Sequence, residues 1–221
     1  MRMPPRSRRI GLVVLASLAS AAITLGIGPG VADTAQQGQD ASRQLKDAAA
    51  FQAITDAGDR SRALFTEAAK VITDPRCMNC HPVTRQPTQG DDMHPHIPFM
   101  HAGVSGIGVD GLACRTCHRA ENTSVSGSRL RSIPGNAHWS LAPLSMGWQG
   151  HSLGYICRQI KDPERNGGRS LAQIRQHLAE DHLVAWAWHP GEGRRPAPGT
   201  QAGFGALIAA WIETGAECPP E

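Results

Sequence analysis

Four of the six cysteines fall into two copies of one short pattern, C-x-x-C-H. The copies are Cys77-Met78-Asn79-Cys80-His81 and Cys114-Arg115-Thr116-Cys117-His118. This spacing is the attachment signature of a c-type haem, in which two thiols add to the vinyl groups of one porphyrin and the histidine binds the iron. With 6 cysteines and 10 histidines in 221 residues, two accidental copies are not expected. The motifs therefore predict two covalent haems, with His81 and His118 as the proximal iron ligands.

Two other uses of the cysteine pairs have to be weighed. Two C-x-x-C pairs can make a tetrahedral zinc site, but 33 residues separate Cys80 from Cys114, which is longer than the usual spacing of a zinc ribbon. A disulfide within each pair, as in a redox enzyme, is the other alternative. The histidine directly after each pair favours haem over both.

An iron that only transfers electrons needs a sixth ligand, and His and Met are the usual ones. The loop Asp91–His101 lies between the two motifs and is stiffened by prolines, so we expect His96 to reach back over a haem face. Met146, in a loop flanked by Pro143 and Gly147, and His138 are the other predicted ligands. A core methionine is the alternative for Met146.

Several other residues near the motifs have ordinary explanations. His177 lies near the apolar face of its helix, where a hydrogen-bonded histidine is the commoner outcome. Haem propionates would pair with arginines, for which Arg169, Arg194 and Arg195 are candidates. The tryptophans either pack on porphyrin edges or simply fill the core.

Cys157 and Cys218 remain after the motifs are counted. In an oxidising compartment, two cysteines outside the motifs indicate one disulfide. It would join a helix around Tyr155–Lys161 to the C-terminal tail. Two unrelated buried thiols are the alternative.

Residues 1–32 have the three parts of a secretory signal peptide: an arginine-rich start, an apolar run over Ile10–Ile27 and small residues at Gly30–Ala32. An uncleaved membrane anchor is the alternative. Cleavage removes four of the 22 basic residues and none of the 19 acidic ones, which leaves a nearly neutral chain. No basic patch points to nucleic acid. We expect a periplasmic protein with no integral membrane span after cleavage.

Helical spacing and loop residues alternate along the rest of the chain, and no run alternates like a strand. Helices are expected within Asp40–Thr73, over Ser152–Ile160, after Ser170 and over Ala202–Thr214. The predicted fold is mostly α, a loop-rich c-type cytochrome with short helices packed around two haems. Its predicted parts are the signal peptide 1–32, an N-terminal helical segment 33–73 and a di-haem domain 74–221.

The second half also contains a run of local patterns: Asn136–Pro143, Met146–Trp148, Ile156–Asp162, Asn166–Arg169, His177, Asp181–Gly191 and Arg195–Gly199. Together with the two motifs, the stretch from Cys77 to Pro219 resembles a family of small exported proteins labelled isoquinoline 1-oxidoreductase subunit. The resemblance implies an electron-acceptor subunit that works beside a molybdenum hydroxylase. Where the family has Val-x-Arg-Gly, this chain has Phe99–Gly103, which leaves His96 a better shared ligand than His101.

These features predict an electron-transfer protein rather than an enzyme. It would accept electrons from a dehydrogenase and pass them to another cytochrome or an oxidase. The alternative is an enzyme such as a di-haem peroxidase, in which one iron lacks a sixth ligand. The surplus histidines are compatible with this class. A sensor that binds small ligands without turnover is a third class.

Overall fold

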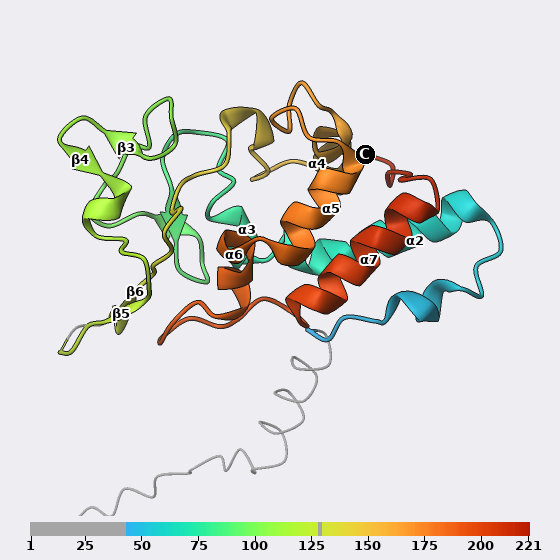
Figure 1. The fold of residues 1–221 in the computed structure, drawn as a ribbon, viewed down its shortest axis with the longest axis horizontal. Coiled ribbons are helices and arrows are strands. Elements are labelled where there is room, and N and C mark those ends of the chain that lie inside the picture. Colours follow the sequence, from blue (N-terminus) through green and yellow to red (C-terminus); the bar gives the residue numbers. More distant parts are fainter. Residues whose placement is uncertain (1–42, 128–129) are drawn as a thin grey trace, which may run out of the picture. The chain divides into compact units, whose positions relative to one another are not determined.

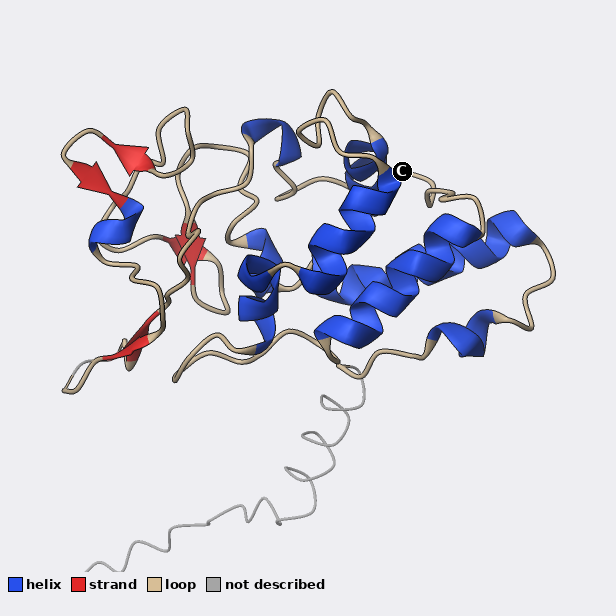
Figure 2. Ribbon diagram, in the orientation of Figure 1, coloured by secondary structure: helices blue, strands red, loops and turns tan. Residues whose placement is uncertain are grey.

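Short helices joined by long loops make up most of the described chain (Figure 2). The computed structural model describes residues 43–127 and 130–221, so the predicted signal peptide 1–32 lies outside the described residues. The helices are η1 Ala48–Phe51, α2 Ala57–Ile72, α3 Pro75–Met78, η2 Cys114–Thr116, η3 Leu144–Met146, α4 Leu153–Lys161, α5 Leu171–Glu180, α6 His182–Ala185, η4 Trp186–Trp188 and α7 Gln201–Glu213. The expectation of a mostly α, loop-rich chain is confirmed.

The strands are three antiparallel pairs of two residues each. β1 Thr88–Gln89 pairs with β2 His94–Pro95, β3 Gly108–Val109 with β4 Leu112–Ala113, and β5 Thr123–Ser124 with β6 Ser132–Ile133. A two-residue strand is too short to show alternation, so the sequence pattern did not predict them.

Helices α2 and α7 run side by side and form the centre of the core (Figure 1). Asp56 caps α2 by accepting a hydrogen bond from the backbone N–H of Asp59, and Thr200 caps α7 in the same way. Phe65 of α2 packs against Trp211 of α7, with ring centroids 4.9 Å apart, and both side chains are fully buried. Residues from the predicted N-terminal segment and from the predicted haem domain therefore share one core.

Helix α5 also packs against α7, and a glycine sets how closely. Ser170 and Gln173 form a capping box at the start of α5, the helix expected after Ser170. A Cβ added to Gly205 of α7 would lie 2.5 Å from the Cβ of Ala179. The two helices therefore approach at a distance that only glycine permits at this point.

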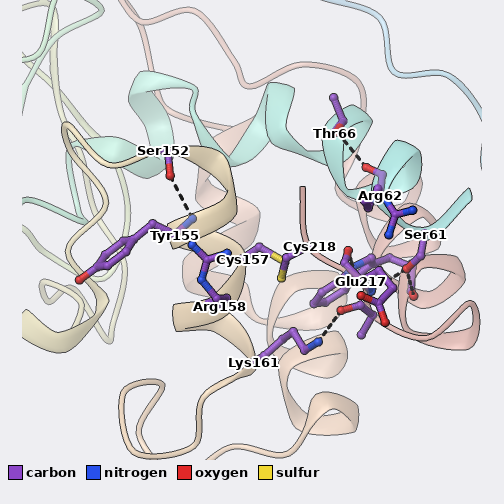
Figure 3. Close-up of a disulfide and its surroundings, with 12 residues drawn as sticks. Ser61, Arg62, Thr66, Ser152, Tyr155, Cys157, Arg158, Lys161, Glu217 and Cys218 are labelled. Carbon is purple, nitrogen blue, oxygen red and sulfur yellow. Dashed lines mark hydrogen bonds between the residues drawn. A yellow bond between two sulfur atoms is a disulfide. The ribbon is translucent and has the colours of Figure 1, made fainter. Parts of the chain in front are cut away.

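The C-terminal tail is bound to the helices by a disulfide and several hydrogen bonds (Figure 3). Cys157 of α4 and Cys218 form the disulfide, which confirms the sequence prediction. Lys161 donates to the carbonyl of Ala216 at 2.6 Å. Ser61 of α2 donates to the carbonyl of Trp211 and accepts from the N–H of Glu217. The tail thus joins α2, α4 and α7.

Within residues 43–127 and 130–221, no helix has the length and apolar character needed to cross a membrane.

Candidate functional site

The first C-x-x-C-H motif begins on the one-turn helix α3. Asp74 caps this helix by accepting from the N–H of Arg76 at 2.9 Å, and Pro75 occupies its first position, where a missing N–H has no cost. The turn continues past the helix, because the N–H of Cys80 donates to the carbonyl of Cys77. This local fold places both cysteines and His81 along the wall of one cavity.

The ring of His81 is held in one orientation. Its Nδ1 lies 2.8 Å from the carbonyl oxygen of Met146, and since a carbonyl only accepts, Nδ1 carries the proton. The ring also stacks on Trp148, with centroids 3.5 Å apart and planes at 7°. Burial lowers the pKa of His81 to about 4, so the ring is neutral. Nε2 is therefore left with a free lone pair, the state that a metal-binding histidine needs.

The cavity beside His81 has a volume of about 320 Å³, within the range of roughly 300–1,000 Å³ usual for ligand and cofactor pockets. Its apolar walls come from α2, α4, α5, α6 and α7, through Ile72, Ile160, Ile174, Leu178, Leu183, Val184 and Phe204. Cys77 and Cys80 line it as free thiols. Burial raises the pKa of Cys77 strongly and that of Cys80 to about 11, which favours uncharged sulfur at this wall.

Two donors in the cavity wall have no hydrogen-bond partner in the described residues: Arg76 Nε and Trp148 Nε1. Both side chains are buried, at 3% exposure each. An unpaired buried donor costs about 1–3 kcal/mol, so Arg76 Nε, which lies 4.0 Å from Oδ1 of Asp74, and Trp148 Nε1 are candidate donors to a bound acceptor. The carboxylates of a haem propionate are acceptors of this kind, and the residues present fit the predicted cofactor.

The second motif repeats the arrangement of the first. Cys114 begins the 3-10 helix η2, Cys117 follows its last residue, and His118 Nδ1 lies 2.8 Å from the carbonyl of Pro134. The His118 ring stacks on Trp139, with centroids 4.5 Å apart and planes at 9°. Here too, Nδ1 donates, an indole faces the ring, and Nε2 is free to bind. This site is more open, since Cys117 is exposed and Cys114 half-buried.

His96 lies close to His118, with ring centroids 5.9 Å apart. Its Nδ1 lies 2.8 Å from the carbonyl of Pro98, which again leaves Nε2 free. A metal held between two imidazoles by bonds of about 2 Å separates the ring centres by roughly 6 Å. The placement agrees with His96 as the sixth ligand at the second site, which stays a prediction.

One tryptophan connects the two sites. Trp139 stacks on His118, and it also lines the cavity of the first site. Trp186, edge-on to Trp139 with centroids 5.0 Å apart, lines the same cavity. The two attachment sites therefore share a wall.

The structure places the other predicted ligands around the first cavity. Met146 is buried and lines it, but its carbonyl accepts from Nδ1 of His81, so its backbone lies on the side of that ring away from Nε2. His138 is exposed and also lines the cavity. Of the arginines, Arg169 lines the cavity, Arg194 donates to Ser132 near the second site, and Arg195 is exposed.

Neither alternative use of the cysteines is seen. Cys77, Cys80, Cys114 and Cys117 are all free, so no disulfide forms within a motif. Among the residues that the structure describes, no three His, Cys, Asp or Glu side chains gather as a metal site, so the two pairs do not meet as a zinc-binding tetrad.

Sequence reasoning missed Arg76 and the stacking of Trp148 and Trp139 on the two proximal histidines. It also took His177 for an ordinary hydrogen-bonded residue. That ring does bond Asp181, at 3.3 Å, but it lines the cavity as well. The sequence feature that could have identified His177 as a cavity residue is its position between Ile174 and Leu178 on the apolar face of α5.

No family model, no curated protein and no solved structure matches this chain, so its function has to be inferred from the two sites themselves.

Proposed function

We propose that this chain is a periplasmic c-type cytochrome with two covalently bound haems, and that it transfers electrons between redox proteins. The observation that supports this best is the repeated arrangement at the two motifs. Each motif histidine donates Nδ1–H to a backbone carbonyl and stacks on an indole. This orientation leaves Nε2 available at both motifs, as two iron-binding histidines require.

The residues have distinct roles in this proposal. The thiols of Cys77 and Cys80, and of Cys114 and Cys117, would hold the haems by adding across their vinyl C=C bonds, with each thiol hydrogen passing to the neighbouring carbon. His81 and His118 bind iron through Nε2. Arg76 and Trp148 offer their unpaired donors to a propionate. The bound haems supply one-electron chemistry, while the protein sets potential and access.

Transfer between the sites follows from their shared wall. Trp139 touches the proximal ring of one site and lines the cavity of the other. At the second site a further imidazole, that of His96, has its ring centroid 5.9 Å from that of the proximal one, which supports a second histidine ligand there. An iron with six ligands exchanges electrons without binding a substrate, which favours a carrier over an enzyme.

Most of the large apolar side chains that are exposed lie in the chain segment that contains the second motif. Nine of the ten large apolar side chains that are exposed in the described residues lie between residues 83 and 130: Val83, Met93, Ile97, Phe99, Val104, Ile107, Val109, Leu112 and Leu130. On the proposed function, exposed apolar side chains of this segment are candidates for contact with a redox partner. A dehydrogenase as donor, such as the molybdenum hydroxylase implied by the resemblance, and a cytochrome or oxidase as acceptor are the proposed partners.

Mass spectrometry of the exported protein tests the proposal directly. Two haem additions that survive acid-acetone extraction are expected, falling to one in either double variant, Cys77→Ala/Cys80→Ala or Cys114→Ala/Cys117→Ala. Wild-type protein without covalent haem would overturn the proposal.

The optical spectrum then separates a carrier from an enzyme. A reduced spectrum that does not respond to carbon monoxide is expected for six-coordinate haems. A carbon monoxide response together with hydrogen peroxide turnover would instead support the peroxidase-like alternative.

A further inference from the structure

His177 lies on the wall of the first cavity, and the proposed function assigns it no role. Its helix, α5, is fixed against α7 by the close contact at Gly205. The ring is half-buried and lines the same cavity as His81, Cys77 and Cys80. A rigid helix thus presents an imidazole to the space in which the first haem would sit.

The His177 ring is oriented in the same sense as the other candidate ligands. Its Nδ1 lies 3.3 Å from Oδ2 of Asp181, one helical turn further along. A carboxylate on Nδ1 fixes the tautomer and leaves the Nε2 lone pair free, which is how ligating histidines are commonly oriented. Asp181 is itself fixed, because its Oδ1 accepts from the N–H of Leu183 at 2.7 Å.

Met146 cannot reach the far side of the first iron. Its carbonyl oxygen lies 2.8 Å from His81 Nδ1. A ligand opposite Nε2 would be roughly 9 Å from that oxygen, allowing for the imidazole ring and two metal–ligand bonds of about 2 Å each. A methionine sulfur extends only about 6 Å from its own carbonyl oxygen. The sixth ligand must therefore come from another element.

His138 is the remaining histidine on the cavity wall, and its position is less suited to the role. It is exposed, and the described residues show no hydrogen bond to its ring. The neighbouring Trp139 is directed to His118 of the second site. His138 thus lacks both the burial and the orienting partner that His177 has.

We infer that His177 is the sixth iron ligand of the first haem, opposite His81, with Asp181 as its positioning residue. This inference rests on the proposed function, because it requires a haem at Cys77 and Cys80. It makes both haems bis-histidine centres, with His81 and His177 at the first and His118 and His96 at the second.

The test is His177→Ala in the exported, haem-loaded protein, with His138→Ala as the matched control. Mass spectrometry should show two haems in both variants. In His177→Ala one of the two haems should turn high-spin and bind carbon monoxide, and added imidazole should restore the low-spin spectrum. His138→Ala should keep the wild-type spectrum.

A second substitution keeps the inference testable if His177→Ala folds poorly. His177→Met should remain low-spin but raise the potential of one haem, because methionine ligation raises the potential relative to histidine. The inference would be overturned if His177→Ala carries two haems, remains low-spin and shows no spectral change with carbon monoxide. That result would leave the proposed function intact. A wild-type chain without covalent haem would overturn both.

Discussion

At the scale of single residues, three histidines share the same hydrogen bond from Nδ1 to a backbone carbonyl. His81, His118 and His96 each direct Nδ1 to a backbone carbonyl at 2.8 Å. A carbonyl accepts but never donates, so this hydrogen bond sets the tautomer without adding charge. His177 differs, because its Nδ1 faces the carboxylate of Asp181. A negative charge behind a ligand makes it a stronger electron donor, so the two centres should differ in potential.

Replacing Asp181 by Asn tests this difference. The substitution removes a negative charge that stabilises the oxidised iron through His177, so the potential of one haem should rise while that of the other stays unchanged. Potentiometric titration followed optically measures both. Glu180→Gln is the control, because it removes the same charge from an exposed neighbouring position. Equal shifts in both variants would contradict a role through His177.

Trp148 should matter for stability as well as for the site. It is buried against His81, so Trp148→Ala should lower the free energy of unfolding by about 3–5 kcal/mol. Trp148→Phe keeps an aromatic ring against His81 but loses Nε1, and should lower it by much less. Denaturant unfolding of the haem-loaded protein measures both. Equal losses would show that stacking on His81 contributes little.

At the scale of elements, packing between helices positions the site. The cavity wall includes residues from five helices, among them α5, which is fixed by its crossing with α7. The capping residues Ser170 and Asp74 define where α5 and α3 begin. The local fold thus determines which residues face the cavity, and interhelical contacts determine how far apart they lie.

Gly205→Ala tests the crossing of α5 and α7. The added Cβ would meet Ala179 at 2.5 Å, so the helices must separate, at a cost of about 1–3 kcal/mol in the free energy of unfolding. Gly203→Ala is the control, since on the same helix its Cβ would meet only the Thr200 side chain, at 3.3 Å. Thermal unfolding should show a loss for Gly205→Ala and little change for Gly203→Ala. Similar midpoints would argue against a close crossing.

The sequence predicted local features better than spatial ones. The helix after Ser170 was predicted from its cap and its apolar spacing, as was the helix over Ala202–Thr214. The stacking of Trp148 on His81 joins residues 67 positions apart, which no local pattern encodes. A buried donor without a hydrogen-bond partner, such as Arg76 Nε, can be identified only once the surrounding side chains are located in three dimensions.

At the scale of the whole molecule, the second site is open and the first is enclosed. Cys117 is exposed, whereas Cys77 is half-buried and lines the cavity between helices. On the proposed function, a redox partner would approach the second site directly, while the first would exchange electrons through the shared wall at Trp139. The expected route therefore runs from the outside through the second haem to the first, or the reverse.

The disulfide is the main covalent link between distant parts of the described chain. Cys157 and Cys218 are 61 residues apart, so Cys157→Ser/Cys218→Ser should lower the free energy of unfolding by about 2–4 kcal/mol. Dithiothreitol should lower the melting temperature of the wild type but not of the variant, because thioether bonds to haem resist this reductant. A wild-type melting temperature that does not respond to the reductant would contradict the prediction.

The enclosure of the first motif has a consequence for the biogenesis of the protein. In the folded chain the high pKa values of Cys77 and Cys80 leave both thiols protonated and poorly nucleophilic at neutral pH. On the proposed function, we therefore expect covalent attachment at this motif to precede folding of the chain around the cavity. The exposed thiol of Cys117 stays reachable for longer. Maturation would then run from the first motif to the second, with the polypeptide folding around a cofactor already joined to it.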